Sequence, residues 1–246
     1  MIEMGADLKI SVIIPTWKEA ANLPRTLQAV FGQNFEGELE VIVVDGGSSD
    51  ETLKVAESLG TKVMQSARRR RSTQMNLGAS AAQGEIFLFL HADTIVPGGG
   101  FEAMLRGISE AGVCGGGFAR RFDSQSLFLK MTCWLAEIRN RSFGWHLGDQ
   151  AIFCRAEAFK ELGGFRDWDR FEDLDFSRRL GGRGKIVTVR PPVVSSARRF
   201  EREGPWKRTM RDFLLTVSYL RGKPEAIENA QARTDQANCE TRMGAH

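Results

Sequence analysis

Over the first 110 residues, short apolar runs alternate with segments whose apolar residues recur at helical spacing. The predicted strands are 9–15, 39–45, 61–65 and 86–90, and the predicted helices are 23–31, 50–59, 72–83 and 101–110. The run from Ile86 to Leu90 holds five consecutive apolar residues, which is typical of a strand covered on both faces. The alternation predicts an α/β fold whose mixed, mainly parallel sheet is flanked by helices.

The second half of the chain is less regular. Its predicted strands are 114–122, 149–154 and 185–189, and its predicted helices are 127–138, 156–162, 172–180 and 206–220. No linker separates these elements, so we expect residues 1–224 to form a single domain. Residues 225–246 are polar and lack apolar periodicity, which predicts a mobile tail.

Composition narrows the class of protein. The chain has 246 residues, is 42% hydrophobic and carries a net charge of +3, too little to indicate a nucleic-acid partner. Its cysteines (Cys114, Cys133, Cys154 and Cys239) lack metal-binding spacing, and no signal peptide is predicted. We therefore expect reduced thiols in a cytoplasmic protein. No apolar stretch approaches the ~20 residues of a membrane span, and the oligomeric state is left open.

Candidate chemistry begins where the strand 86–90 ends. His91 and Asp93 lie two residues apart, so in an extended segment their side chains project the same way. Ligands of open α/β sheets bind beyond the carboxyl ends of the strands. A carboxylate held there suits a hard divalent cation that carries a diphosphate. A solvated loop is the alternative interpretation.

Three motifs in order carry a resemblance to a known family. They are Lys9-Ile-Ser-Val-Ile-Ile-Pro-Thr-Trp-Lys-Glu-Ala-Ala-Asn22, the loop Asp45-Gly-Gly-Ser-Ser-Asp-Glu-Thr52, and His91-Ala-Asp93. Over residues 8 to 215 the chain resembles family 2 glycosyltransferases of the GT-A fold. The resemblance implies a nucleotide-diphosphate sugar donor and Mn²⁺ or Mg²⁺ held by Asp93, with His91 as a second candidate ligand. The implied donor-binding residues in this region are Pro15, Thr16, Glu19, Asp45, Gly46, His91, Ala92 and Asp93.

Two positions depart from the family pattern. The family loop carries two adjacent aspartates, and Gly46 stands at the second position, so the identity of the donor base is open. The metal motif begins with His91 where the family has Asp. Imidazole suits Mn²⁺ better than Mg²⁺, and His91 either binds the metal or only hydrogen-bonds the diphosphate.

The run Arg68 to Arg71 allows three interpretations: a solvated helix start, a nucleic-acid patch, or part of a donor site. In the family, an Arg about five residues before a matching Asn lies near the donor nucleotide. The resemblance therefore implies donor contacts for Arg71 and Asn76, and leaves the other three arginines as surface charges. A guanidinium suits phosphate oxygens because it supplies forked donors.

Acidic residues mark the acceptor side. Asp149 and Gln150 occupy the segment that contacts the acceptor in the family, although Asp149 fits a turn cap equally well. Glu172 and Asp173 lie in the first turn of the predicted helix 172–180, where the helix dipole by itself favours acidic residues. The resemblance implies that Asp173 is the catalytic base and that Glu172 orients the loop or contacts the acceptor. Gly163 and Gly164 are expected to form a helix C-cap.

The segment from Val193 to Trp206 resembles a lid that closes over the donor diphosphate, with Arg198 or Arg199 stabilising the leaving group. Together with Leu88-Phe-Leu-His-Ala-Asp-Thr94 it resembles a bacterial subfamily of arsenosugar biosynthesis, also found with radical-SAM genes. The stretch Phe128 to Trp145 could bind a lipid acceptor at a membrane surface. A helix that packs its apolar face on the core is the preferred interpretation.

These observations predict an inverting glycosyltransferase that acts on an acceptor hydroxyl of a small molecule or glycan. Two alternatives stay open. One is a degenerate nucleotide-sugar-binding protein without turnover, which Gly46 and His91 favour and Asp93 argues against. The other is a sugar nucleotidyltransferase, but no Gly-rich signature near the first strand is suited to a triphosphate.

Overall fold

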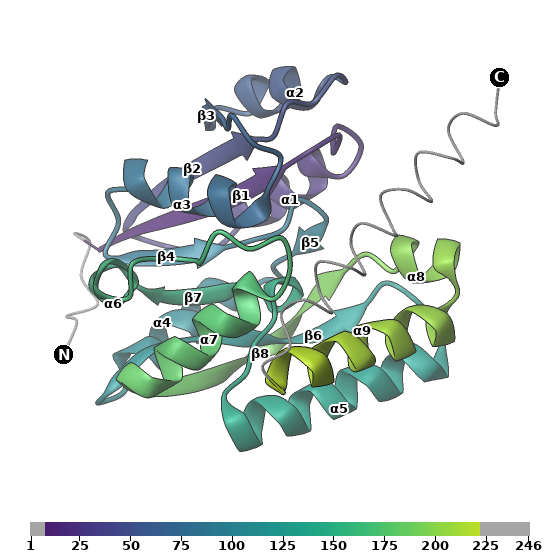
Figure 1. The fold of residues 1–246 in the computed structure, drawn as a ribbon. Helices are drawn as coiled ribbons and strands as arrows, with labels where there is room; N and C mark the ends of the chain where they lie inside the picture. Colours follow the sequence, from purple (N-terminus) through teal and green to yellow (C-terminus); the bar gives the residue numbers. More distant parts are fainter. Residues whose placement is uncertain (1–7, 222–246) are drawn as a thin grey trace, which may run out of the picture. The chain divides into compact units, whose positions relative to one another are not determined.

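A computed structural model describes residues 8–221 and contains an eight-stranded sheet (Figure 1). Its strands are β1 Lys9–Thr16, β2 Glu38–Asp45, β3 Lys62–Gln65, β4 Ile86–Phe89, β5 Thr94–Ile95, β6 Val113–Phe122, β7 Ile152–Arg155 and β8 Lys185–Ser195. Their order across the sheet is β3-β2-β1-β4-β7-β6-β8-β5. β1 pairs in parallel with β2 and β4, whereas β7 runs antiparallel to β4 and β6. The predicted mixed, mainly parallel sheet is confirmed.

Seven α-helices accompany these strands. They are α1 Leu23–Phe31, α2 Thr52–Ser58, α3 Arg71–Ala81, α4 Gly100–Ser109, α5 Leu127–Phe143, α6 Ala156–Glu161 and α7 Glu172–Arg183. A short 3-10 helix, η1 Gly148–Gln150, precedes β7. The chain divides into two compact units after Ala197, and the described part of the second unit holds α8 Arg198–Glu203 and α9 Pro205–Leu220. The predicted tail 225–246 lies outside the described residues, and one domain over 1–224 stays a prediction.

Strand β4 is buried on both sides, as its apolar run predicts. Ile86 and Leu88 belong to one hydrophobic cluster, whose helical members come from α1, α2 and α4. Phe87 and Phe89 belong to the other cluster, with members from α3, α6 and α7. Because successive side chains of a strand point to opposite faces, this division places helices on both faces of the sheet. β1 and β4 are therefore held rigidly where their carboxyl ends reach the site.

Two predicted boundaries in the second half move for local reasons. The predicted strand 149–154 divides into η1 and β7, because Ala151 takes a left-handed φ of 47° between them. β8 continues through Pro191 and Pro192 to Ser195, where the prediction ended it at 189. A register shift between Phe118 and Arg120 of the neighbouring β6 accommodates the two prolines, which cannot donate ladder hydrogen bonds.

Helix α5 corrects the prediction that its apolar face packs on the core. Only Leu129, Ala136 and Asn140 are buried, while six large apolar side chains are exposed. The helix is also longer than predicted, because Gly144 at φ 66° ends it after Phe143. Nowhere in residues 8–221 is a helix both long and apolar enough to cross a membrane.

Candidate active site

Asp45 ends β2 and organises the turn that follows it. Its buried carboxylate accepts hydrogen bonds from the backbone N–H groups of Gly47 (2.8 Å) and Ser48 (2.7 Å). The hydroxyls of Ser48 (2.5 Å) and Thr16 (3.1 Å) donate to it as well. Four donors therefore converge on one carboxylate. Asp45 shapes the loop at the ends of β1 and β2, where donor contacts are predicted.

Gln74 of α3 holds the same strand ends together. Its side-chain amide donates to the carbonyl oxygens of Thr16 and Val44, both at 2.8 Å. A Cβ at Gly46 would lie 3.2 Å from the Gln74 amide nitrogen and 3.3 Å from Cα of Arg69. Gly46 therefore lets α3 approach the loop closely. Sequence reasoning missed Gln74, because its partners are backbone atoms of distant strands.

Three further predicted donor-site residues lie at the same edge and have structural partners. Pro15 is buried within β1. Glu19 accepts a hydrogen bond from the Asn22 side chain (2.8 Å), which starts the turn into α1. Ala92 is buried, and its carbonyl accepts from the Thr26 hydroxyl at 2.8 Å. These contacts fix the backbone at the carboxyl ends of β1 and β4.

Arg71 at the start of α3 pairs with Glu172 at the start of α7. The two groups approach to 3.0 Å, and the Glu172 side chain is 1% exposed against 39% for Arg71. The negative charge of Glu172 is the main cause that raises the pKa of Arg71, and the charges of Asp173, Asp149 and Asp93 add to it. Arg71 is thus the cation around which the predicted catalytic, acceptor and metal residues gather.

Burial raises the pKa of Glu172 to about 7, and the charge of Arg71 only partly offsets this. Its Oε1 faces Arg71, whereas Oε2 is buried without a hydrogen-bond partner in the described part of the chain. Phe171 just before it takes a left-handed φ of 62°, which is rare for a non-glycine residue. The strained backbone therefore turns Glu172 and Asp173 into the site at the first turn of α7.

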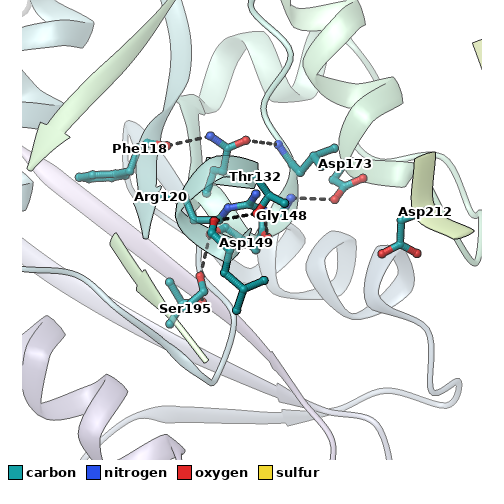
Figure 2. Close-up of polar contacts among 12 residues, drawn as sticks. Phe118, Arg120, Thr132, Gly148, Asp149, Asp173, Ser195 and Asp212 are labelled. Carbon is teal, nitrogen blue, oxygen red and sulfur yellow. Dashed lines mark hydrogen bonds and ion pairs between the residues drawn. The ribbon is translucent and has the colours of Figure 1, made fainter. Parts of the chain in front are cut away.

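Asp173 is held against the turn that carries Asp149. One carboxylate oxygen accepts from the backbone N–H of Gly148 and the other from that of Leu174, each at 2.7 Å. Figure 2 shows Gly148 and Asp149 between Asp173 and Arg120. A Cβ at Gly148 would lie 2.7 Å from Nε2 of His91 and 3.2 Å from Oδ2 of Asp173. Only a glycine lets the imidazole and the carboxylate approach from two sides.

Asp149 forms an ion pair with Arg120 of β6, whose side chain is 9% exposed (Figure 2). Burial alone would raise the pKa of Asp149, but Arg120, His91 and Arg139 outweigh it and lower that pKa. Oδ1 of Asp149 is buried without a hydrogen-bond partner among residues 8–221. The charged pair supports the turn, and the predicted contact of Asp149 with an acceptor stays a prediction.

Gln150 is completely buried and ties three segments together. Its amide nitrogen donates to the Phe118 carbonyl (3.0 Å), and its oxygen accepts from Arg139 of α5 (2.7 Å). Burial, followed by repulsion from Arg120, lowers the pKa of Arg139 to about 10. Gln150 therefore positions Asp149 from behind, and its predicted contact with the acceptor stays a prediction.

A narrow gap separates these groups. Its lining residues are Met75, Phe89, His91, Gly148, Ile152, Phe165, Glu172 and Asp173. The gap measures about 10 Å³, room for about one water molecule and too little for a sugar. It marks where His91, from the end of β4, meets the start of α7. A substrate must therefore bind on the open side of this junction.

The metal hypothesis rests on Asp93 and His91. Both are half-buried and follow β4, as predicted. No group of three His, Cys, Asp or Glu residues in the described chain is arranged to hold a metal. Mg²⁺ and related ions commonly bind one or two carboxylates together with substrate phosphates. The donor set fits a cation that arrives with a diphosphate, and does not fit a cage built from protein ligands alone.

Other predicted residues lie elsewhere or have local roles. The Asn76 side chain donates to the Phe165 carbonyl (2.7 Å) and accepts from the Phe165 N–H group (2.9 Å). It therefore attaches the segment before α7 to α3. Arg70 pairs with Asp167 (3.0 Å) and Asp169 (2.6 Å), and therefore acts as a tether where a surface charge was expected. Arg198 and Arg199 begin α8 in the second unit, and their contact with the donor stays a prediction.

Arg120 and Arg139 are site residues that sequence reasoning missed. Each lies in an ordinary polar position of a strand or helix, and only the packing of α5 against β6 brings them to Asp149. The sequence offers only a weak signal for these two arginines, namely that both lie in elements whose other residues are largely apolar. A buried arginine requires a partner, but the sequence does not show which arginines are buried.

Comparisons with known proteins identify the family and the fold. A family model described as glycosyl transferase family 2 matches residues 11–162. A PGL/p-HBAD biosynthesis glycosyltransferase of Mycobacterium bovis is 39% identical over 89 residues, which cover 34% of each chain. The mannosyltransferase PcManGT from Pyrobaculum calidifontis, solved with GDP-Man and Mn²⁺, superposes with a TM-score of 0.65 at 20% identity. That match covers 78% of this chain and 57% of PcManGT.

The S. aureus TarS fragment 1–349, solved with UDP-GlcNAc, gives a TM-score of 0.61 at 19% identity, over 77% of this chain and 58% of that one. The chain thus spans about a third of the mycobacterial relative and under two thirds of either solved structure. At such identities the structural matches establish the fold alone.

Proposed function

Because this chain belongs to glycosyl transferase family 2, we propose that its site transfers a sugar from a nucleotide-diphosphate donor to an acceptor hydroxyl with inversion at the anomeric carbon. The protein is a glycosyltransferase with the GT-A fold. The observation that carries the finer proposal is that His91 and Asp173 meet at Gly148, the residue before Asp149.

Asp173 is the proposed base. Backbone N–H groups hold both of its oxygens, so the carboxylate has a fixed direction and keeps further lone pairs for a proton. It accepts the proton of the acceptor hydroxyl while that oxygen forms a bond to the anomeric carbon. The bond from this carbon to the donor diphosphate breaks, and its electron pair leaves with the diphosphate. Such a displacement requires no covalent enzyme intermediate and inverts the carbon.

The charge of the site supports a role for a divalent cation. The carboxylates of Asp93, Asp149 and Asp173 all contribute to the raised pKa of Arg71, and each would repel an anionic diphosphate. When bound, Mn²⁺ or Mg²⁺ offsets this charge and acts as a Lewis acid on the leaving group. Asp93 would hold it with its carboxylate, His91 is the second candidate ligand, and Arg71 is the protein cation for the phosphates.

The donor base is less constrained. PcManGT was solved with GDP-Man and the TarS fragment with UDP-GlcNAc, so neighbours of the same fold bind different bases. Here Asp45 accepts four hydrogen bonds from its own loop and Gly46 has no side chain. We infer that base selection falls to other residues near the strand ends. The arsenosugar subfamily remains a proposal on the motifs that resemble it.

A thermal-shift titration tests the donor site first. The protein is titrated with UDP, GDP, CDP, dTDP and ADP, each with and without Mn²⁺. A nucleotide at ~100 times its dissociation constant should stabilise the fold by about 2.7 kcal/mol. A shift with one nucleotide that requires Mn²⁺ and is lost in Asp93→Ala supports the proposal. No shift with any nucleotide contradicts it.

Product analysis then separates the alternatives. Incubation with the matching sugar nucleotide and an acceptor library should release a nucleoside diphosphate in proportion to the glycosylated product. Pyrophosphate release from a nucleoside triphosphate and a sugar phosphate would instead identify a nucleotidyltransferase. Tight binding without consumption of the donor would identify a degenerate binding protein.

A further inference from the structure

Helix α5 presents apolar residues on two opposite faces. Leu129 and Ala136 are buried toward the sheet. The exposed large apolar residues are Leu127, Met131, Trp134, Leu135, Ile138 and Phe143, with 80% of Leu127 and 61% of Trp134 accessible. At about 100° per residue, all of these except Phe143 fall within an arc of about 100° on the side opposite the buried pair. We call these five residues the α5 stripe.

Contiguous exposed apolar patches are uncommon on soluble proteins, and where they occur they mark sites of interaction. Cations accompany the α5 stripe. Lys130 and Arg141 are exposed and lie along one border of the stripe. The only carboxylate of α5, Glu137, pairs with Arg141 (2.9 Å) and with Arg190 of β8. The surface beside the stripe therefore keeps a net positive charge.

We propose that α5 docks the enzyme on a bilayer that contains anionic phospholipid. A helix with Trp and Leu on one side and Lys or Arg at its border is suited to lie in the plane of the interface, where its apolar side chains enter the acyl boundary. The cations meet anionic headgroups. This charge complementarity selects lipid over a purely apolar protein groove. The inference goes beyond the proposed function, because it concerns where the enzyme works.

The docking helix is connected directly to the site. Arg139 near the end of α5 donates to the Trp145 carbonyl (3.0 Å) and to Gln150 (2.7 Å), which lies next to Asp149. The acceptor-side turn is therefore fixed relative to the helix. An enzyme docked through α5 would hold this turn in a constant orientation to the lipid surface.

The second unit carries the same chemistry independently. Trp206, Met210, Phe213 and Leu214 of α9 repeat the spacing of Leu127, Met131, Trp134 and Leu135, and all four are exposed. Residues 198–221 contain seven Lys or Arg and three Asp or Glu, a net charge of +4 that exceeds the +3 of the whole chain. We infer on these grounds that α9 is also an interfacial helix.

Vesicle flotation with the full chain and no donor tests both helices. The wild type should bind vesicles of phosphatidylcholine with phosphatidylglycerol, bind phosphatidylcholine alone more weakly, and lose affinity at high salt. Trp134→Asp and Phe213→Asp should each weaken binding about tenfold or more, because an apolar contact is replaced by a charge. Phe31→Asp is the matched control, since Phe31 is 45% exposed at the end of α1, and it should bind like the wild type.

A second measurement locates the contact. Brominated lipids should quench tryptophan fluorescence in the wild type. Trp134→Phe should keep vesicle binding but lose much of this quenching, whereas Trp168→Phe should not. The proposal for α5 is overturned if the wild type binds neither vesicle or if Trp134→Asp binds unchanged. It is also overturned if Trp134→Asp dissociates a dimer seen by light scattering, because the stripe then meets a second copy. Since no donor is present, these outcomes are independent of the proposed transfer.

Discussion

The part of the sheet proposed to bind the donor, residues 9–95 (the donor half), and the part proposed to bind the acceptor, residues 113–195 (the acceptor half), use polar residues differently. In the donor half, Asp45 and Gln74 bind backbone and hydroxyl groups at neighbouring strand ends. In the acceptor half, Arg120 and Asp149 are buried as a charged pair from segments 29 residues apart. In the first arrangement, neutral donors surround a single carboxylate. In the second, a carboxylate faces a guanidinium group.

The two arrangements also differ in completeness. The carboxylate of Asp45 has four hydrogen-bond donors, whereas Asp149 and Glu172 each keep one buried oxygen without a partner in the described chain. An unsatisfied buried oxygen is costly, so the acceptor half carries a cost in stability that the donor half does not.

The largest effect is expected at Asp173. Asp173→Asn keeps an oxygen for the Gly148 N–H but cannot accept the proton of the acceptor, so the transfer rate should fall by about 10²–10⁴. Donor binding in the thermal-shift assay should be unchanged. Asp167→Asn is the matched control, because Asp167 is 52% exposed and pairs with Arg70 outside the site. Wild-type transfer by Asp173→Asn would remove Asp173 from the mechanism.

Breaking the buried pair should cost more than breaking an exposed one. Arg120→Gln removes the nearest cation from the half-buried Asp149, so the free energy of unfolding should fall by about 3 kcal/mol in urea titrations, the lower end of the effect for a buried pair. Lys54→Gln is the control, because Lys54 pairs with Glu51 (2.8 Å) on the surface with 77% of its side chain exposed, and no measurable change is expected. Equal effects of the two substitutions would contradict the difference between the halves.

Stability should depend on pH through Glu172. Its pKa is raised to about 7, so the folded protein holds a proton that the unfolded chain releases near pH 4.5. The raised pKa contributes on the order of 3 kcal/mol to the free energy of unfolding. This stabilisation is fully present below about pH 4.5 and is lost as pH rises through about 7. Glu172→Gln, which cannot ionise, should therefore gain stability relative to the wild type between about pH 5 and pH 8. If the melting temperatures of the wild type and of Glu172→Gln change in parallel across that range, the pKa of Glu172 is not raised.

The smallest of the four effects is expected in the donor half. Asp45→Asn replaces one carboxylate oxygen, which accepts hydrogen bonds, by an NH₂ group, which donates them. This group faces either the N–H donors of Gly47 and Ser48 or the hydroxyls of Ser48 and Thr16. The free energy of unfolding should therefore fall by about 1–3 kcal/mol. Nucleotide affinity should fall with it, because the loop loses its order, while Asp173-dependent chemistry is retained at saturating donor. A fully stable variant that binds no nucleotide would instead make Asp45 a direct ligand.

Most elements were predictable from the sequence because their signals are local. The strands at Lys9–Thr16 and Ile86–Phe89 and the helix at Leu23–Phe31 follow from apolar runs, a 3.6-residue period and a Pro near a helix start. β5 was missed because two residues carry no periodicity, and α8 because its six residues are almost all polar. The end of β8 was missed because prolines normally end a strand.

The candidate site divides in the same way. The sequence by itself determined the order of the motifs, the fold they imply, and the positions of Asp93 after β4 and of Asp173 in the first turn of α7. These features depend on residues close together in the chain. Only the tertiary structure decided that Arg120 meets Asp149, that Gln150 is buried, and that the α5 stripe faces outward. Apolar periodicity shows that a helix has two faces. Which face meets the sheet is settled only when the sheet has formed.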